Sequence, residues 1–368
     1  MFLMMRWFLP VLFLFFPVSS FGGELTVTDS LGRSVTVPAE PQRIIASGSG
    51  TLRLVTYLQA QDRIVAVDSA ESRVSFIPAR PYSIANPRFR DLPVFGEFRG
   101  LDNPELIAGL FPSPQVIFKV SPLSGPHPDQ LTAKTGIPVV GLEYGDLTGK
   151  REDLYTTLRM MGKILGKNRR AEEVITFFEQ HLGEIARRTS DIPEENRPSC
   201  YIGGVSFRGG HGFTSTEPGY PPFAWTGAKN IAAGLAAGKS ANVTISKEKL
   251  LEWDPEIIFI DMNTITAGEQ ADALHQLKTD PALKVLSAVR KGNLYGVLPY
   301  NSYTINYGSV LANGYFVGKT LYPERFSDID PVKKADEIYE FLVGKPVFAI
   351  ISDAFSGMVF SKIDPEGK

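Results

Sequence analysis

The most constraining feature of the sequence is a long amphipathic segment at residues 168–190, NRRAEEVITFFEQHLGEIARRTS. Its apolar residues recur at helical spacing and form one narrow stripe, while charged and amide residues occupy the positions between them. The spacing predicts a helix that Asn168 caps and that the Asp191-Ile192-Pro193 step ends. About 22 residues make a rod of roughly 33 Å, the width of a small domain. Strand-rich halves flank it, so we expect a connection between two lobes; the alternative is one more surface helix of a single domain.

The first 22 residues have the layout of a secretory signal. Arg6 supplies a positive charge, residues 7–18 are apolar, and Ser20-Phe21-Gly22 offers small residues at the −3 and −1 positions of a cleavage site. The apolar run is short and Pro17 interrupts it, which argues against a membrane-spanning helix. We therefore expect an exported, soluble protein that loses its signal and works in the periplasm.

Composition and motif content narrow the functional classes. The 38 basic and 40 acidic residues give no electrostatic case for nucleic acid binding. The single cysteine, Cys200, lies in an apolar run, so we expect a buried side chain, no intramolecular disulfide and no lipid anchor after the signal. Signatures of hydrolases, zinc proteases and phosphate loops are absent, so we expect neither an enzyme nor a resident cofactor. Three histidines, His127, His181 and His275, are expected to be ordinary surface residues.

Short apolar strands alternate with helices in both halves, which predicts an α/β fold with mostly parallel sheets. An opening hairpin is expected over residues 24–37. Strands are expected at residues 43–46, 63–68, 94–95, 115–120 and 137–142 in the first half, and at 199–205, 256–261 and 293–298 in the second. We divide the chain into a signal at 1–22, an N-terminal lobe at 23–150, a helical connection at 151–196 and a C-terminal lobe at 197–368.

The two halves share one local signature. In each, a glutamate in the first turn of a short helix precedes a proline by seven residues, and an apolar strand follows. The pairs are Glu105 with Pro112 and Glu248 with Pro255. Equal spacing in equal context favours two similarly built lobes. Each glutamate also has a purely structural explanation, because a carboxylate at the second helical position complements the helix dipole.

The opening LTVTDSLGRSVTVPAEPQRIIA, the two glutamate–proline joints and the long helix together resemble the ABC-transporter substrate-binding proteins for iron complexes and cobalamin, most closely the iron-complex subset. The resemblance covers roughly residues 24–345. It implies two Rossmann-like lobes joined by one long rigid helix, a ligand cleft between them and a small closure. It also implies a monomer whose partners are an ABC permease and its ATPase, with Glu105 and Glu248 docking to permease arginines. The sequence departs from the family pattern at Ser113-Pro114-Gln115, where a shorter Pro-Asp joint is usual.

Loops at the carboxyl ends of the strands should carry the ligand site. Arginine suits an anionic chelate because its planar fork pairs with carboxylates, and aromatic side chains offer flat apolar area with a polar edge. The glycines beside His211 allow close backbone approach or a tight turn, and His211 as a metal ligand is a further alternative. The predicted ligand-binding residues are Ser49, Arg53, Arg73, Arg80, Tyr82, Phe98, Arg99, Phe207, Arg208, His211, Trp225, Tyr300 and Tyr303.

These residues favour an anionic iron chelate, such as a ferric siderophore with catecholate or carboxylate groups. A corrinoid is the first alternative, because its flat ring would use the aromatics but needs fewer arginines. Haem is the second, with His211 or a tyrosine as the axial ligand. A receptor that senses the ligand without transport would share the same architecture.

Overall fold

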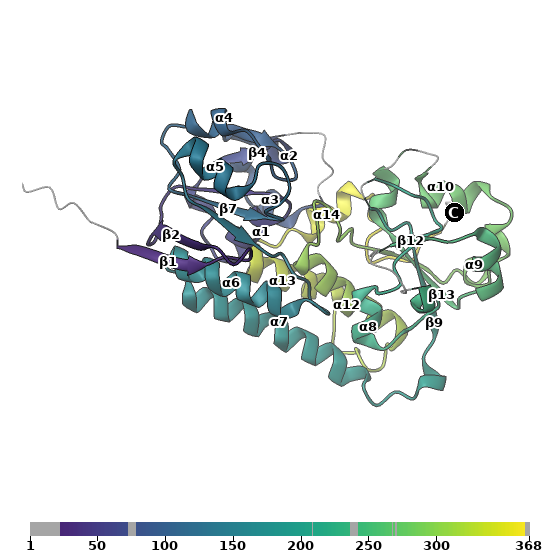
Figure 1. The fold of residues 1–368 in the computed structure, drawn as a ribbon. Coiled ribbons are helices and arrows are strands. Elements are labelled where there is room, and N and C mark those ends of the chain that lie inside the picture. The colour runs from purple at the N-terminus through teal and green to yellow at the C-terminus, as the bar shows by residue number, and fades with distance from the viewer. Residues whose placement is uncertain are drawn as a thin grey trace, which may run out of the picture.

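A computed structural model describes residues 23–72, 79–207, 209–235, 242–266, 268 and 271–364. Two α/β lobes lie side by side, and the long helix α7 (Asn168–Thr189) runs along one side of both (Figure 1). The expected signal and the candidates Arg73 and Arg208 lie outside the described residues. No helix within the described ranges is long and apolar enough to cross a bilayer.

The first lobe is built on a six-stranded sheet with the order β6-β5-β4-β3-β7-β8, in which every pair is parallel except β5 with β6. Its central strands are apolar and buried, as expected for a sheet covered by helices on both faces. The strands are β3 (Ile44–Ser47), β4 (Ile64–Asp68), β5 (Val94–Glu97), β6 (Leu101–Asp102), β7 (Val116–Val120) and β8 (Val139–Leu142). The helices are α1 (Thr51–Tyr57), α2 (Ser69–Ser72), α3 (Pro81–Ala85), α4 (Pro104–Ala108), α5 (Pro128–Thr135) and α6 (Arg151–Leu165).

The opening hairpin forms as predicted. Strand β1 (Glu24–Thr28) pairs antiparallel with β2 (Ser34–Pro38). Its turn is fastened to strand β8: the Ser30 N–H donates to the Gly141 carbonyl at 3.0 Å, and the Gly141 N–H donates to the Asp29 carboxylate at 3.0 Å. The hairpin therefore docks onto the edge strand of the first lobe.

The second lobe carries a four-stranded parallel sheet with the order β11-β9-β13-β14. Its strands are β9 (Ser199–Gly203), β11 (Lys229–Asn230), β13 (Ile257–Asp261) and β14 (Leu294–Val297), and a separate short pair is formed by β10 (Ser215–Thr216) and β12 (Val243–Thr244). The helices are α8 (Pro221–Thr226), α9 (Lys247–Trp253), α10 (Ala273–Thr279), α11 (Ser287–Lys291), α12 (Tyr307–Leu321), α13 (Pro331–Val343) and α14 (Phe348–Ala354).

Helix α7 contacts both lobes, packing on α6 in the first and on α8 and α12 in the second. The predicted apolar stripe is buried along its length. One detail of the prediction is wrong, because Lys167 occupies the capping position and Asn168 is the first helical residue. The left-handed Gly166 closes α6, and the Lys167 N–H donates back to the Gly162 carbonyl at 2.7 Å, so α7 begins without a free residue for a side-chain cap.

His181 on α7 is buried, whereas the sequence analysis expects a surface residue. It follows Phe178 by three residues and so lies on the same helical face. Its Nδ1 lies 2.6 Å from the Tyr315 hydroxyl of α12, and burial lowers the pKa of its imidazole to about 4. His181 therefore joins α7 to the second lobe as a neutral side chain.

Helix α13 lies against α1 and α3 of the first lobe, although its residues fall in the range expected for the C-terminal lobe. Arg170 of α7 fixes this return: its Nε donates to the Tyr57 carbonyl at 2.8 Å, and its guanidinium lies 4.1 Å from the centre of the Phe341 ring. The chain thus crosses between the lobes a second time, through α12 and α13.

Candidate ligand-binding cleft

A cleft of about 360 Å³ lies between the two lobes. Each lining residue follows a strand at its carboxyl end, the position where parallel sheets present binding loops. Ser49, Phe98, Arg99, Ser121 and Ser124 come from the first lobe, after β3, β5 and β7, and Phe207, Asn301, Tyr303 and Thr304 come from the second, after β9 and β14.

Five of the predicted site residues meet in this cleft: Ser49, Phe98, Arg99, Phe207 and Tyr303. The Arg99 guanidinium lies 5.0 Å from the centre of the Phe98 ring, and the Phe98 and Tyr303 rings are 6.5 Å apart. One cationic group is therefore placed beside aromatic side chains from both lobes.

Tyr303 bridges the lobes. Its hydroxyl donates to the Asp68 carboxylate at the end of β4 and accepts from the Arg99 N–H at 2.9 Å. Burial raises the pKa of Asp68 to about 7, and the Tyr303 hydroxyl opposes that rise by stabilising the carboxylate. The second lobe thus contacts the first through a hydrogen bond from Tyr303 to the buried Asp68.

Arg53 does not line the cleft. It is completely buried on α1, where it donates to the Ile305 carbonyl at 2.7 Å, to the Ser302 carbonyl at 3.2 Å and to the Tyr144 hydroxyl. These acceptors belong mostly to the second-lobe segment that carries Tyr303. Arg53 therefore holds that segment in place from inside the first lobe.

Arg80 and Tyr82 are also buried away from the cleft. Both donate to the same Glu71 oxygen, at 2.8 Å from Arg80 and 2.6 Å from Tyr82. Arg80 donates in addition to the Ala70 carbonyl at 2.9 Å. The sequence pattern around Glu71 did not point to this role, yet the glutamate supplies the counter-charge that makes these residues an internal network.

The remaining predicted residues of the second lobe lie outside the cleft lining. Tyr300 is buried and donates to the Glu217 carboxylate. Trp225 on α8 packs beside Gly314 of α12. His211 is exposed, and its Nε2 lies 2.6 Å from the carbonyl of Phe207, four residues earlier in the same loop. Within the described ranges no group of three or more histidine, cysteine, aspartate or glutamate residues is placed to hold a metal ion.

The structure places three of the five arginines among the predicted ligand-binding residues. Of the five arginines, Arg73 and Arg208 lie outside the described residues, and Arg53 and Arg80 are buried with other partners. Arg99 is the one of the five that lines the cleft in the part of the chain that the structure describes. Among the described residues, the cleft lining therefore contains one arginine, surrounded by hydroxyl and amide groups.

Ser121, Ser124, Asn301 and Thr304 also line the cleft but are not among the predicted ligand-binding residues. Their signal was their position in loops at the carboxyl ends of β7 and β14, which is weaker than that of an arginine or an aromatic residue.

Residues with left-handed backbone conformation are concentrated in the same cleft. Of the nine non-glycine residues with positive φ in the described chain, four line the cleft: Arg99, Ser121, Tyr303 and Thr304, at 63°, 51°, 54° and 66°. Left-handed backbone is costly for such residues, and it concentrates at functional sites.

Lys119 fixes the backbone next to Arg99. It is fully buried in β7, pairs with Asp102 and donates to the Gly100 carbonyl at 2.8 Å. Gly100 has a φ of 78°, and a side chain there would come within 3.1 Å of the lysine nitrogen. The turn that presents Arg99 is thus held by a buried ion pair.

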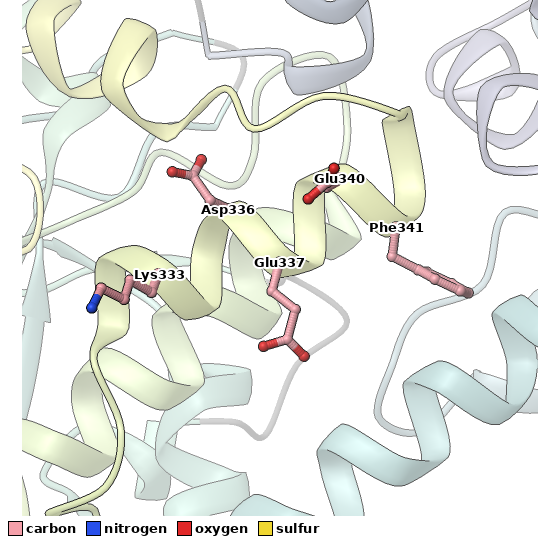
Figure 2. A pocket seen from close by; sticks show the side chains of 5 residues that line it. All are labelled: Lys333, Asp336, Glu337, Glu340 and Phe341. Carbon is pink, nitrogen blue, oxygen red and sulfur yellow. The ribbon is translucent and has the colours of Figure 1, made fainter.

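A second hollow lies on the surface of α13 and is larger but more open (Figure 2). Its labelled side chains leave one helix in different directions. Phe341 stacks on Phe177 of α7 with ring centres 3.9 Å apart, and Glu337 pairs with Lys334 at 2.7 Å. We interpret this hollow as an open depression along α13, because its polar side chains diverge and do not converge on one point.

The predicted docking residues occupy matching positions. Glu105 and Glu248 are the second residues of α4 and α9, and both are exposed. The side chains of Asn103 and Ser246 cap the two helices. Helix α4 lies at the top of the first lobe and α9 at the right of the second, both away from α7 (Figure 1).

Comparison with known proteins identifies the family that shares this architecture. A family model described as periplasmic binding protein matches residues 44–299. The molybdate-binding protein MolA of Haemophilus influenzae is 22% identical over 334 residues, 85% of this chain and 89% of that protein. An iron-uptake system-binding protein of Bacillus subtilis is 26% identical over 140 residues, 38% of this chain and 43% of that protein.

Solved structures share the fold. A periplasmic solute binding protein from Veillonella parvula superimposes with a TM-score of 0.69 at 19% identity, covering 92% of this chain and 97% of that chain. MolA of Haemophilus influenzae bound to molybdate superimposes with a TM-score of 0.66 at 20% identity, covering 88% and 98%. At such identities the likeness concerns the two-lobed fold and leaves the ligand open.

Proposed function

Because this chain belongs to the periplasmic binding protein family, whose members are the extracytoplasmic solute-binding components of ABC importers, we propose that its own solute is an anionic iron chelate. In this proposal the chain binds a ferric siderophore-type ligand between its lobes. It then delivers the ligand to the membrane permease.

The observation that supports this ligand class is the meeting of Arg99 with Phe98, Phe207 and Tyr303 in one cleft. A guanidinium pairs with carboxylate or catecholate oxygens, and the rings cover the organic part of a chelate. Hydroxyl groups of Ser49 and its neighbours add donors for the remaining oxygens. A volume of about 360 Å³ lies in the range of small-molecule sites.

A tetrahedral oxyanion such as molybdate is the second candidate. Short donors dominate the polar lining, with Ser121, Ser124, Asn301 and Thr304 beside Arg99. The relative MolA is named for binding molybdate. A bare oxyanion would leave the three aromatic side chains without a ligand surface to cover, so we place it after the chelate.

Corrinoid and haem are weaker candidates for this cleft. Haem would need an axial ligand. His211 lies outside the cleft lining with its Nε2 beside the Phe207 carbonyl. The hydroxyl of Tyr303, the tyrosine that lines the cleft, already donates to Asp68. A corrinoid would use the rings but would need little from Arg99. A sensing receptor would share the cleft and would lack the docking role that we propose for Glu105 and Glu248.

The ligand class is tested by titrating the ligand-free protein with a ferric catecholate, a ferric hydroxamate, molybdate, cobalamin and haemin, following tryptophan fluorescence. We expect the ferric catecholate to bind best and to weaken as salt rises. Arg99→Gln should weaken it by about 1.5–3 kcal/mol, the usual loss of a hydrogen bond to a charged group. The exposed Arg90 of the same lobe, changed to Gln, is the matched control.

Two results would refute this ligand class. Tight binding of cobalamin alone, indifferent to salt and to Arg99→Gln, would favour a corrinoid. Tight binding of molybdate without any iron chelate would favour the oxyanion.

The transport role is tested by reversing the charge of the docking glutamates. Glu105→Lys and Glu248→Lys should each abolish stimulation of the transporter's ATPase, since an exposed carboxylate that attracts a permease arginine would then repel it. Ligand affinity should stay within about threefold, because neither residue lines the cleft. Loss of ligand binding with unchanged ATPase stimulation would contradict the docking role.

A further inference from the structure

The two glutamate–proline joints are equivalent in position but opposite in surface chemistry. Both place a glutamate second in a short helix, with a proline seven residues later and a parallel strand following. The residue after the glutamate is Leu106 in the first lobe and Lys249 in the second. The residue before the proline is Phe111 in the first lobe and Asp254 in the second.

The first-lobe joint exposes apolar surface. Phe111 is 98% exposed and Leu106 is 49% exposed, and Leu101 on the adjoining edge strand is 53% exposed. Single exposed apolar residues are ordinary, whereas these three lie within eleven residues of sequence, together with the exposed Glu105, and we refer to them as the apolar patch. A partner that covers a fully exposed aromatic side chain would remove a large apolar area from water.

The second-lobe joint is charged and partly occupied by its own chain. Lys249 pairs with Glu252 at 3.0 Å. The Asp254 carboxylate accepts from the Ser287 N–H at 2.7 Å and from the Ser287 hydroxyl at 2.6 Å. This joint therefore presents Glu248 with charged residues at the two positions that are apolar in the first lobe.

We propose that the permease holds the two lobes by different forces: an apolar contact around Leu106 and Phe111 on the first lobe, and a charge contact around Glu248 on the second. This inference rests on the proposed docking function. Its occupant is an extracytoplasmic surface of the permease with apolar side chains around the cation that meets Glu105, and with polar and basic groups opposite Glu248.

Charge complementarity favours that occupant over a second copy of this chain. Glu105 and Glu248 are both exposed, and neither has a salt bridge or side-chain hydrogen bond within the residues that the structure describes. A single partner that spans both lobes can supply a cation to each. In a two-fold pair of identical chains the patch would meet itself and bring the two Glu105 carboxylates together.

The test measures binding of the ligand-free protein to its permease and ATPase in lipid nanodiscs, between about 50 mM and about 500 mM NaCl. Phe111→Ser and Leu106→Ser should each weaken docking about tenfold at every salt concentration, because burial of apolar area is not screened. Glu248→Gln should weaken docking about tenfold at low salt and should have almost no effect at high salt. The matched control is Ile350→Ser on α14, another apolar residue that is 53% exposed.

The outcomes separate this inference from the function on which it rests. If Glu105→Lys and Glu248→Lys leave docking unchanged, or if the wild-type protein does not dock, the proposed docking function itself fails. If those reversals abolish docking while Phe111→Ser and Leu106→Ser have no effect, only the apolar contact is wrong. If wild-type protein sediments as a dimer and Phe111→Ser as a monomer, with docking unchanged, the patch serves a second copy. Thermal melting of each variant checks that the exposed substitutions leave the fold intact.

Discussion

The two lobes bury their acidic side chains in different ways. In the first lobe Glu71 pairs with Arg80 and Asp102 pairs with Lys119. In the second, Glu217 is held by the Tyr300 hydroxyl and Asp261 by the Asn263 N–H at 2.9 Å, and neither has a salt bridge within the described residues. Burial without a cation raises the pKa of both second-lobe carboxyls to about 7.

This difference gives the interiors of the two lobes different electrostatic properties. The first lobe holds Glu71 and Asp102 in ion pairs, and the Lys119–Asp102 pair fixes the turn that presents Arg99. The second-lobe carboxyls, whose pKa values are near 7, change charge in the neutral pH range, so the second lobe responds to pH. Asp68 of the first lobe behaves like the second-lobe acids, and its hydroxyl partner Tyr303 comes from the second lobe.

The strongest way to break the comparison is to remove one member of a first-lobe pair. Lys119→Met leaves Asp102 buried without its cation, and we expect the free energy of unfolding to fall by about 3–5 kcal/mol. Urea denaturation of the full chain measures the loss. The double variant Lys119→Met with Asp102→Leu should recover most of it, because no unpaired charge is then left in the core.

The control for this prediction is an exposed pair. Lys333 lies 3.9 Å from Asp330, and 86% of its side chain is exposed. Lys333→Met should change the free energy of unfolding by less than about 1 kcal/mol. Equal losses for Lys119→Met and Lys333→Met would show that burial of the ion pair does not stabilise the first lobe.

Removing a buried carboxylate from the second lobe should instead raise the free energy of unfolding. The folded pKa of Glu217 is raised to about 7, so its protonated form stabilises the fold fully below the unfolded pKa, and that contribution is lost as pH rises toward 7 and beyond. Glu217→Gln keeps the neutral form at every pH. We expect the variant to be more stable than wild type by about 2–3 kcal/mol at pH 8 and nearly equal to it at pH 4, by urea denaturation.

Comparing variant with wild type isolates this carboxyl from other titrating groups. His181, whose folded pKa is lowered to about 4, acts in the opposite direction, because its contribution is lost as pH falls below its unfolded value. Glu71→Gln is the first-lobe control, and it should destabilise the protein at pH 8 because it leaves Arg80 without its counter-charge. A Glu217→Gln variant that is less stable than wild type at pH 8 would contradict the comparison.

Local sequence patterns were enough to predict most of the fold. The opening hairpin, the buried strands of both sheets, helix α7 and the two glutamate–proline joints depend on residues close together in sequence, and the structure contains each of them. Helical periodicity also places His181 on the buried face of α7. Its residue type alone suggests a surface position, so the burial is found only by following the periodicity residue by residue.

The candidate site was harder to predict because its partners are distant in sequence. Arg53 donates to carbonyl groups about 250 positions later, and Tyr303 reaches back 235 positions to Asp68. Residue type alone pointed to the arginines as ligand-binding residues. Whether an arginine faces a ligand or an internal acceptor depends on these long-range contacts. The serine and threonine lining was overlooked for a related reason, since short hydroxyl side chains are common in every loop.

The smallest expected effect concerns the helix that both lobes share. Gly183 lies on the exposed face of α7, and an added Cβ there would meet nothing within 4 Å. Gly183→Ala should stabilise the protein by about 0.5–1 kcal/mol, because alanine is the better helix former. Thermal melting measures the gain, and Gly23→Ala near the start of the described chain, also with open space around it, is the control outside a helix.

The same substitution tests how far the lobes move. A continuous helix resists bending more than extended strands do, and the return through α12 and α13, fastened by Arg170, adds a second link between the lobes. We therefore expect a lobe rotation of about 10° or less on ligand binding, so that the radius of gyration in solution scattering is nearly unchanged when a ferric catecholate is added. Because α7 moves as a rod in this account, Gly183→Ala should leave both the scattering and the affinity for the chelate unchanged within about twofold. A large compaction on binding, or a compaction that Gly183→Ala suppresses, would show that α7 bends and that the two lobes close about it as a hinge.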